Sequence, residues 1–179
     1  CNACDVDAVT RVYQVKRRNV QLPLPVIVAD ATQILALAVW EPLFEALVER
    51  FWPGPLTLLL TALPHVPSML TGGTGRIAVR ISSHPAAHVL SSALGGALVS
   101  SSANISGRPP VTKVNSLDFA LLSAVDGMIL DGPEPTGNAP STLVELVKDM
   151  PQPTLRVLRP GAITVPQLAS AGYRVIAEG

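Results

Sequence analysis

The composition of this 179-residue chain argues against several classes of protein. Basic and acidic residues balance at 13 each, so a formal net charge of +0 argues against nucleic acid as the main ligand. The hydrophobic fraction of 48% supports a substantial core, whereas aromatic residues make up 4%, and no apolar run reaches the roughly 20 residues that span a bilayer. With no visible secretion signal, we expect a single cytoplasmic domain over residues 1–179 and no membrane partner.

Helical spacing of apolar residues marks the first element. Asp5 can cap a helix in which Val6, Val9 and Tyr13 recur at helical spacing, and we expect this helix to end near Lys16. Residues 23–28 then predict a strand that is entered through prolines.

A second amphipathic helix is predicted over residues 41–51. Its expected apolar face is formed by Leu43, Phe44, Leu47, Val48 and Phe51. The prolines of Pro53-Gly54-Pro55 end this helix, because proline removes a helical hydrogen bond. Residues 56–60 follow as a buried strand.

Residues 76–81 alternate cleanly between apolar and other side chains, which predicts a half-buried strand. Ser83 and Pro85 suit the cap and first turn of a helix that runs to Leu94. Residues 97–100 form a short predicted strand that leads into a cluster of serines.

The last third of the chain continues this mixture of elements. Asn115 or Ser116 is expected to cap a helix through Val125. Further strands are predicted over 127–130, 142–147 and 154–158, and a closing helix over 164–171. Because helices and strands alternate irregularly, we predict an α/β fold with a mixed rather than a purely parallel sheet.

The charges are sorted along the sequence. No carboxylate occurs between Glu49 and Asp118, and none occurs between Asp7 and Asp30. A surface without carboxylates suits an anion, because a nearby negative charge would repel it. The basic residues within the two acid-free stretches are Arg11, Lys16, Arg17, Arg18, Arg50, Arg76, Arg80, Arg108 and Lys113.

Lys16-Arg17-Arg18 stands at a predicted helix end, just before a strand. One reading is a phosphate site; the other is that cations simply favour the negative end of the helix dipole. The dipole accounts comfortably for one positive charge and less well for three. Both readings stay open at this point.

Two segments of small polar residues have the composition of ligand-binding loops. Residues 100–107 follow a strand and offer the Ser102 hydroxyl and the Asn104 amide, although an ordinary polar turn is the alternative. Residues 71–75 consist of glycine and threonine but lack the Gly-Lys-Ser/Thr ending of a phosphate loop. Together they favour a binder of phosphorylated small molecules.

The remaining reactive residues indicate neither a metal site nor a serine hydrolase. Cys1 and Cys4 form one Cys-x-x-Cys spacing without a second pair, so we interpret them as incidental thiols rather than half of a zinc site. His84 and His88 lie four residues apart, but no third ligand of suitable type is near in the sequence. A Gly-x-Ser-x-Gly elbow of a serine hydrolase is also lacking.

Read together, these segments resemble the YrdC-type family of threonylcarbamoyl-AMP synthases. The resemblance runs from Cys1 to about Leu168, in order and with matching spacing. It is carried by Cys1-Asn2-Ala3, Lys16-x-Arg18, Pro23-Leu24-Pro25-Val26, Phe51-Trp52-Pro53-Gly54-Pro55-Leu56-Thr57, Ala78-Val79-Arg80 with His84-Pro85, residues 100–107, Pro140-Ser141-Thr142-Leu143-Val144 and Leu158-Arg159-Pro160-Gly161-Ala162-Ile163.

The resemblance implies a YrdC-like twisted mixed β-sheet flanked by helices, with a concave, positively charged groove. It implies condensation of L-threonine, bicarbonate or CO2 and ATP into threonylcarbamoyl-AMP and pyrophosphate, in the service of tRNA modification. ATP would be a substrate, and Mg2+ would be held mainly by the nucleotide. Downstream tRNA-modification proteins are implied partners.

The resemblance also assigns roles to residues of this chain. Lys16 and Arg18 are implied catalytic residues. The implied nucleotide-binding set is Lys16, Arg18, Ser102, Asn104, Ser141 and Arg159. The implied threonine-binding set is Arg80, Ser100 and Thr142.

Two departures from the family pattern stand out. The family's opening Pro-Thr-Glu-Thr-x-Tyr-Gly strand, which forms a wall of the threonine pocket, is absent from this sequence, and we expect it upstream. Asn19 stands where proline usually follows Lys-x-Arg. Three alternatives stay open: a carbamoyltransferase domain that makes carbamoyl-adenylate, a double-stranded RNA-binding module that contacts RNA through a basic groove, and an inactive homologue.

Overall fold

The computed structural model describes residues 1–130, 132–133 and 139–177. A mixed β-sheet forms the centre of the fold. The strand order is β5-β1-β4-β3-β6-β7-β8, with β2 paired to β3. The strands are β1 (Val26–Val28), β2 (Ala38–Val39), β3 (Leu56–Ala62), β4 (Arg76–Ile81), β5 (Leu98–Val99), β6 (Thr142–Val147), β7 (Thr154–Arg159) and β8 (Arg174–Ala177). Parallel pairs such as β1·β4 and antiparallel pairs such as β3·β4 both occur, which confirms the predicted mixed α/β sheet.

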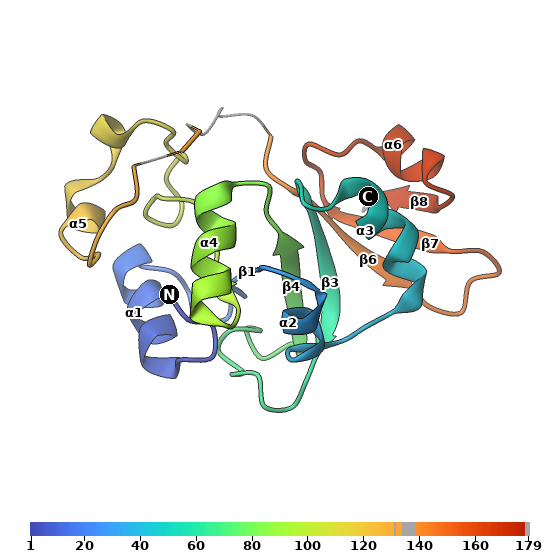
Figure 1. The fold of residues 1–179 in the computed structure, drawn as a ribbon, viewed down its shortest axis with the longest axis horizontal. Helices are drawn as coiled ribbons and strands as arrows, with labels where there is room; N and C mark the ends of the chain where they lie inside the picture. The colour runs from blue at the N-terminus through green and yellow to red at the C-terminus, as the bar shows by residue number, and fades with distance from the viewer. Residues whose placement is uncertain (131, 134–138, 178–179) are drawn as a thin grey trace.

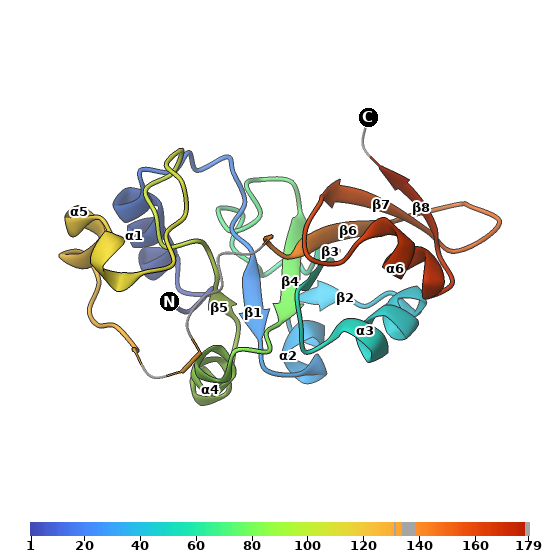
Figure 2. The same cartoon turned by 90° about the horizontal axis from the view of Figure 1, so that it is seen from above.

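Helices α2, α3 and α4 lie on one side of the sheet, and α1 and α5 lie beyond its β5 end (Figures 1 and 2). The helices are α1 (Val6–Lys16), α2 (Ala31–Leu35), α3 (Glu45–Phe51), α4 (Pro85–Leu94), α5 (Phe119–Leu122) and α6 (Val165–Ser170), with 3-10 turns η1 (Pro42–Phe44) and η2 (Val114–Ser116). No helix in the described part of the chain is long and apolar enough to cross a membrane.

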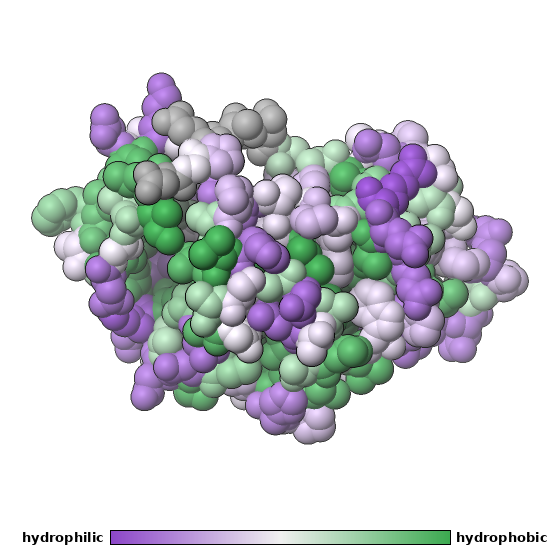
Figure 3. Space-filling view, viewed as in Figure 1, coloured by the Kyte–Doolittle hydropathy of each residue, from purple (hydrophilic) through white to green (hydrophobic). Residues whose placement is uncertain are grey.

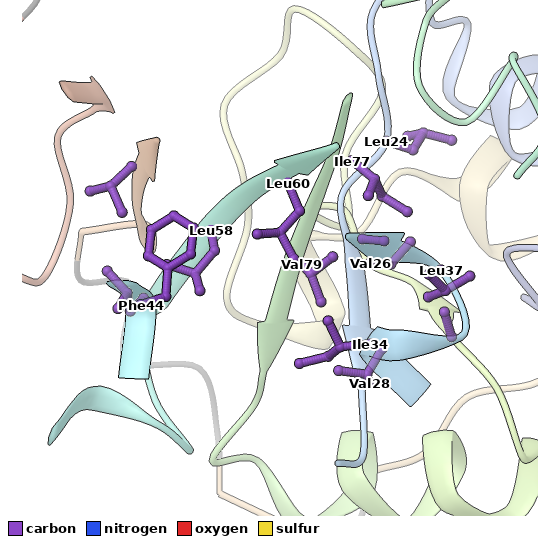
Figure 4. Close-up of a cluster of buried hydrophobic side chains, with 14 of the residues drawn as sticks. Leu24, Val26, Val28, Ile34, Leu37, Phe44, Leu58, Leu60, Ile77 and Val79 are labelled. Carbon is purple, nitrogen blue, oxygen red and sulfur yellow. The ribbon is translucent and has the colours of Figure 1, made fainter. Parts of the chain in front are cut away.

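The core is packed from alternate residues of the central strands and from the helices above them. Leu58 on β3 lies opposite Val79 on β4, and both are fully buried. Phe44 and Ile34 approach the same core from the helical side (Figure 4). Because strand side chains alternate, Arg80, the neighbour of Val79, points to the opposite face of the sheet.

Large apolar side chains also remain exposed, over α4 and toward α5 (Figure 3). On α4 these are Val89, Leu90 and Leu94, and on α5 Phe119 is the most exposed.

Local sequence signals located several elements correctly. The Asp5 carboxylate caps α1 by accepting a hydrogen bond from the Ala8 N–H, as predicted. The strands β4, β6 and β7 and the closing helix α6 occur where the pattern places them. Strand β1 is shorter than predicted, because Pro23 and Pro25 lack the N–H that a sheet interior requires.

The predicted helix over 41–51 was wrong in its first turn. Residues 42–44 form η1, and α3 begins only at Glu45. A 3-10 turn places successive side chains at wider angles than an α-helix. Leu43, which was assigned to the buried face, is therefore turned outward and 54% exposed.

The prediction for 83–94 was right in extent but wrong at its cap. His84 is the N-cap residue of α4 and makes no side-chain capping bond. The Ser82 hydroxyl accepts a hydrogen bond from the His84 N–H, so the serine that stabilises this turn is Ser82 rather than Ser83.

Two predictions between 115 and 130 were wrong. Instead of one helix to Val125, there is the turn η2 and the short helix α5, which Asp118 caps through the Ala120 N–H. Residues 127–130, predicted as a strand, pair with no strand among the described residues and are exposed. Apolar composition alone does not make a strand without a neighbouring strand to receive its hydrogen bonds.

Core burial leads to a first prediction. Replacing the fully buried Leu58 by alanine removes packed methyl groups and leaves a cavity, so Leu58→Ala should lower the free energy of unfolding by about 2 to 5 kcal/mol. Leu43→Ala is the matched control, because its side chain is mostly in solvent. Urea unfolding of both variants measures the difference, and equal losses would contradict the assignment of Leu43 to the surface.

Candidate functional site

The structure gathers three of the predicted site residues where α1 ends. The buried Lys16 ammonium donates to the carbonyl oxygens of Ser102 at 2.5 Å and Asn104 at 2.6 Å. Burial, and then the positive charge of Arg18, lower the pKa of Lys16. Lys16, Ser102 and Asn104 therefore belong to one cluster, as the sequence predicted, but the ammonium contacts the chain itself.

The loop that carries Ser102 and Asn104 is closed by its own hydrogen bonds. The Ser102 hydroxyl donates to Asn104 Oδ1. The Asn104 Nδ2 group donates to the carbonyl oxygens of Ile105 at 3.1 Å and Arg108 at 2.6 Å. Every polar atom of the Asn104 side chain is thus engaged within the loop, which gives the loop a fixed shape.

Arg18 lies next to this cluster, but its guanidinium turns toward the following loop. It donates to the carbonyl oxygens of Leu22 at 3.3 Å and Pro23 at 3.0 Å. These contacts fix the turn that leads into β1. Arg18 contributes its positive charge near Lys16, and two of its five N–H donors are used by backbone carbonyl oxygens.

A second cluster brings Arg80 and Arg159 together on the sheet face opposite the core. Arg159 donates to the Ser141 carbonyl oxygen at 2.8 Å and to its hydroxyl at 2.9 Å. Burial lowers the pKa of both guanidinium groups, and the charge of Arg159 lowers the pKa of Arg80 further. Two neighbouring cations that repel each other are a natural site for an anion.

Arg80 has no counter-charge within the described part of the chain. None of the ion pairs found there includes Arg80 or Arg159. The arginine hydrogen bonds there also include none from Arg80. By contrast, Arg76 on the same strand is paired with Glu145. A half-buried guanidinium without an acceptor has its hydrogen-bonding capacity free for a ligand.

Thr57 is a member of this cluster that sequence reasoning did not assign. Its hydroxyl lies 2.7 Å from the Ser141 hydroxyl, and its side chain is buried. The available signal was a single threonine within the leucine-rich strand 56–60. Its partner lies 84 residues away, so only the pairing of β3 with β6 reveals the contact.

The two remaining predicted threonine ligands differ in accessibility. The Thr142 hydroxyl is buried, donates to the Ile163 carbonyl oxygen at 2.7 Å and accepts from the Ile163 N–H at 2.9 Å, so it is occupied by the fold. Ser100 is partly exposed, and its N–H donates to the Pro25 carbonyl oxygen at 2.8 Å, which ties β5 to the entry of β1. Ser100 is thus open to a ligand and Thr142 is not.

A cavity of about 480 Å³ lies beside the Lys16 cluster, between α1 and the 121–127 segment. Its size suits a small organic ligand. An ion pair between Arg11 and Asp126 at 2.9 Å links the two walls. The lining is mainly aliphatic and includes Val12, Val15, Lys16, Ser102, Leu121 and Val125.

The two clusters do not form a metal site from protein ligands. No group of three or more histidine, cysteine, aspartate or glutamate side chains gathers in the described ranges 1–130, 132–133 and 139–177. Cys1 and Cys4 are free thiols on the surface. The hydrogen-bond donors at the clusters are hydroxyls and cations, and the carbonyl oxygens there accept from these cations.

Comparison with known proteins gives consistent matches. The model of the Sua5, YciO and YrdC family, described as telomere recombination, matches residues 1–161. A threonylcarbamoyl-AMP synthase of Bacillus subtilis is 36% identical over 93% of this chain and 47% of its own length. One from Alkalilimnicola ehrlichii is 36% identical over 80% of this chain and 76% of its own. The chain spans about half the length of the first of these relatives.

Solved structures agree with the sequence matches. Sua5 of P. abyssi, crystallised with L-threonine, superposes with a TM-score of 0.81 at 32% identity, over 98% of this chain and 51% of that protein. YciO of E. coli gives a TM-score of 0.70 at 22% identity, over 90% of this chain and 77% of that protein, and shares the fold. The twisted mixed sheet expected from the resemblance is therefore confirmed, while the charge of its groove stays a prediction.

The free guanidinium of Arg80 leads to the second prediction. Arg80→Met removes a half-buried cation that repels Arg159, so the variant without ligand should melt at a higher temperature than the wild type. Pyrophosphate should raise the Tm of the wild type and raise that of Arg80→Met less, because one anion contact is lost. Arg76→Met is the control, because Arg76 is neutralised by Glu145. Equal pyrophosphate shifts in all three proteins would show that Arg80 binds no anion.

Proposed function

Because the chain belongs to the Sua5/YciO/YrdC family, we propose that it is an L-threonylcarbamoyladenylate synthase. It would condense L-threonine, bicarbonate or CO2 and ATP into threonylcarbamoyl-AMP and pyrophosphate. Relatives that carry this activity in their names match over 93% of the chain. The structural observation that carries the proposal is the pair of a half-buried Arg80 and a more exposed Arg159, neither of which has a carboxylate partner among the residues that the structure describes.

The proposed reaction needs no nucleophile from the protein. The threonine amine adds to CO2 and loses a proton, which gives a carbamate. A carbamate oxygen then attacks the α-phosphorus of ATP, the bond to the β-phosphate oxygen breaks, and pyrophosphate leaves. Two anions meet in this step, so the barrier is dominated by their repulsion and by the ordering of three reactants.

Fixed cations and neutral donors lower such a barrier by matching the charge of the transition state. Arg80 and Arg159 are suited to the phosphates because both are cations on the same face of the sheet, and the partial burial of Arg80 reduces the screening of its charge by water. The Ser141 hydroxyl, held by Thr57 and Arg159, adds a fixed polar group at the same place. Ser102 and Asn104 would hold another part of the nucleotide through their loop.

In place of the catalytic roles that the resemblance implies, we propose electrostatic and positioning roles for Lys16 and Arg18. Their backbone contacts leave Lys16 one N–H and give both a fixed positive field near the Ser102 loop. Magnesium would be coordinated by the phosphates and water, where it neutralises developing charge. The chain's hydroxyls and cations would orient the phosphates around it.

The threonine site is proposed next to the phosphates. Arg80 is at hand for a carboxylate, and Ser100 is open to an amino-acid ligand. The buried Thr142 would act indirectly, because its bonds to Ile163 fix the start of β6 next to Ser141. The product would pass to tRNA-modification proteins, in the cytoplasm, and contact with RNA would be secondary to ATP binding.

The third prediction tests the activity. The purified protein should release pyrophosphate from ATP only when L-threonine and bicarbonate are both present. Arg159→Met removes a cation and its hydrogen bonds to Ser141, and should lower kcat/KM by roughly 100-fold or more. Arg156→Met is the matched control on the same strand, because Arg156 is paired with Glu145 at 2.7 Å.

Two further outcomes distinguish this activity from the alternative functions. Pyrophosphate release that depends on carbamoyl phosphate would replace the proposal by a carbamoyl-adenylate-forming activity. Tight, strongly salt-dependent RNA binding without ATP binding would favour an RNA-binding module. An equal loss in Arg159→Met and Arg156→Met would remove the special role of Arg159.

A further inference from the structure

The last residue of α1 is attached to the serine-rich loop by three hydrogen bonds. Two come from the Lys16 ammonium to the carbonyl oxygens of Ser102 and Asn104. The third runs from the Ser106 N–H to the Lys16 carbonyl oxygen at 2.9 Å. Lys16 is only 5% exposed, so the ammonium lies against the loop's carbonyl side rather than free in solvent.

These bonds fix the orientation of the peptide groups in the loop. A trans peptide group is planar, and its C=O and N–H point in opposite directions. Because the Ser102 carbonyl points at Lys16, the Ala103 N–H points away from it. That N–H has no hydrogen-bond partner among the described residues, and Ala103 is exposed.

The side chains of the loop are less available to a ligand than its backbone N–H groups. The Asn104 amide is bonded to Ser102, Ile105 and Arg108. The buried Ile105 side chain anchors the loop from below. The outward donor at the centre of the loop is therefore the Ala103 N–H, and peptide N–H groups presented by a shaped loop are effective donors to phosphate oxygens.

We propose that Lys16 is a positioning residue that holds the Ser102–Ala103 peptide group so that the Ala103 N–H donates to a phosphate of ATP. This inference rests on the proposed function for the identity of the ligand. Lys16 acts through the loop, by holding its carbonyl oxygens. It differs from a direct lysine–phosphate contact, in which the loop would keep its shape without the ammonium.

Lys16→Met and Arg17→Asn separate the two roles. Lys16→Met keeps a long apolar stem and removes the donors. Arg17→Asn removes a neighbouring exposed charge, and Asn tolerates the left-handed backbone at this position, where φ is 49°. The measurements are amide hydrogen exchange of the protein without nucleotide and the Kd for ATP from calorimetry.

In Lys16→Met, the Asn104 and Ser106 amides should exchange faster without nucleotide, because the loop loses its anchor. The Kd for ATP should rise roughly 10- to 100-fold, as expected when a hydrogen bond to a charged group is lost. Arg17→Asn should leave the exchange unchanged and alter the Kd much less. Unchanged loop exchange in a folded Lys16→Met protein would overturn the proposal.

A measurement on the wild-type protein keeps the proposal testable if Lys16→Met does not fold. In 15N-labelled protein, the Ala103 amide proton should shift downfield on titration with ATP. An Ala103 resonance that stays in place at saturating ATP overturns the proposal. If the Ala103 shift occurs while pyrophosphate release needs no threonine, the proposed function fails and the role of Lys16 stands.

Discussion

The arrangement of the site depends on a positive charge that no carboxylate in the described part of the chain neutralises. Arg80 lies on the sheet face away from the core, next to Arg159, and repulsion and burial lower the pKa of its guanidinium. Keeping such a group in place costs free energy unless a ligand supplies the opposite charge. On the Arg159 side, the polar contacts of this cluster come from the Thr57 and Ser141 hydroxyls rather than from carboxylates. The stretch between Glu49 and Asp118 is free of acids, which keeps local sequence from neutralising the site.

The sequence could predict those parts of the fold that depend on neighbouring residues. Alternation over 76–81 identified β4, and the Asp5 cap located the start of α1. Contacts between distant segments could not be read in this way. The Thr57–Ser141 pair joins residues 84 positions apart, and it exists only because β3 lies parallel to β6. Apolar residues at 127–130 were assigned to a strand because composition does not reveal whether a partner strand is near.

The same contrast between local sequence and long-range contacts applies to the predicted site residues. Their chemical types were recognised from the sequence, but the use of each polar atom depends on the folded backbone. Lys16 and Asn104 are residue types that often contact ligands. In the structure, however, their hydrogen bonds hold the serine-rich loop in shape. The Thr142 hydroxyl is likewise used within the fold, because it donates to the Ile163 carbonyl oxygen. Arg80 is the opposite case, because its guanidinium remains without an acceptor in the described part of the chain.

Two different parts of the structure, the arginines on the sheet and the Ser102 loop, would therefore contact the proposed nucleotide. The sheet places Arg80 on β4 and Arg159 on β7 along one face, with β3 and β6 between these two strands, so strand register fixes the positions of their backbones. The Ser102 loop is irregular and takes its shape from Lys16 at the end of α1. The two cations favour negative charge on this face of the sheet, whereas the Lys16 contacts, together with the loop's own hydrogen bonds, fix which backbone donor of the loop faces outward. Preorganisation of this kind lowers a barrier between anions without any residue entering the covalent chemistry.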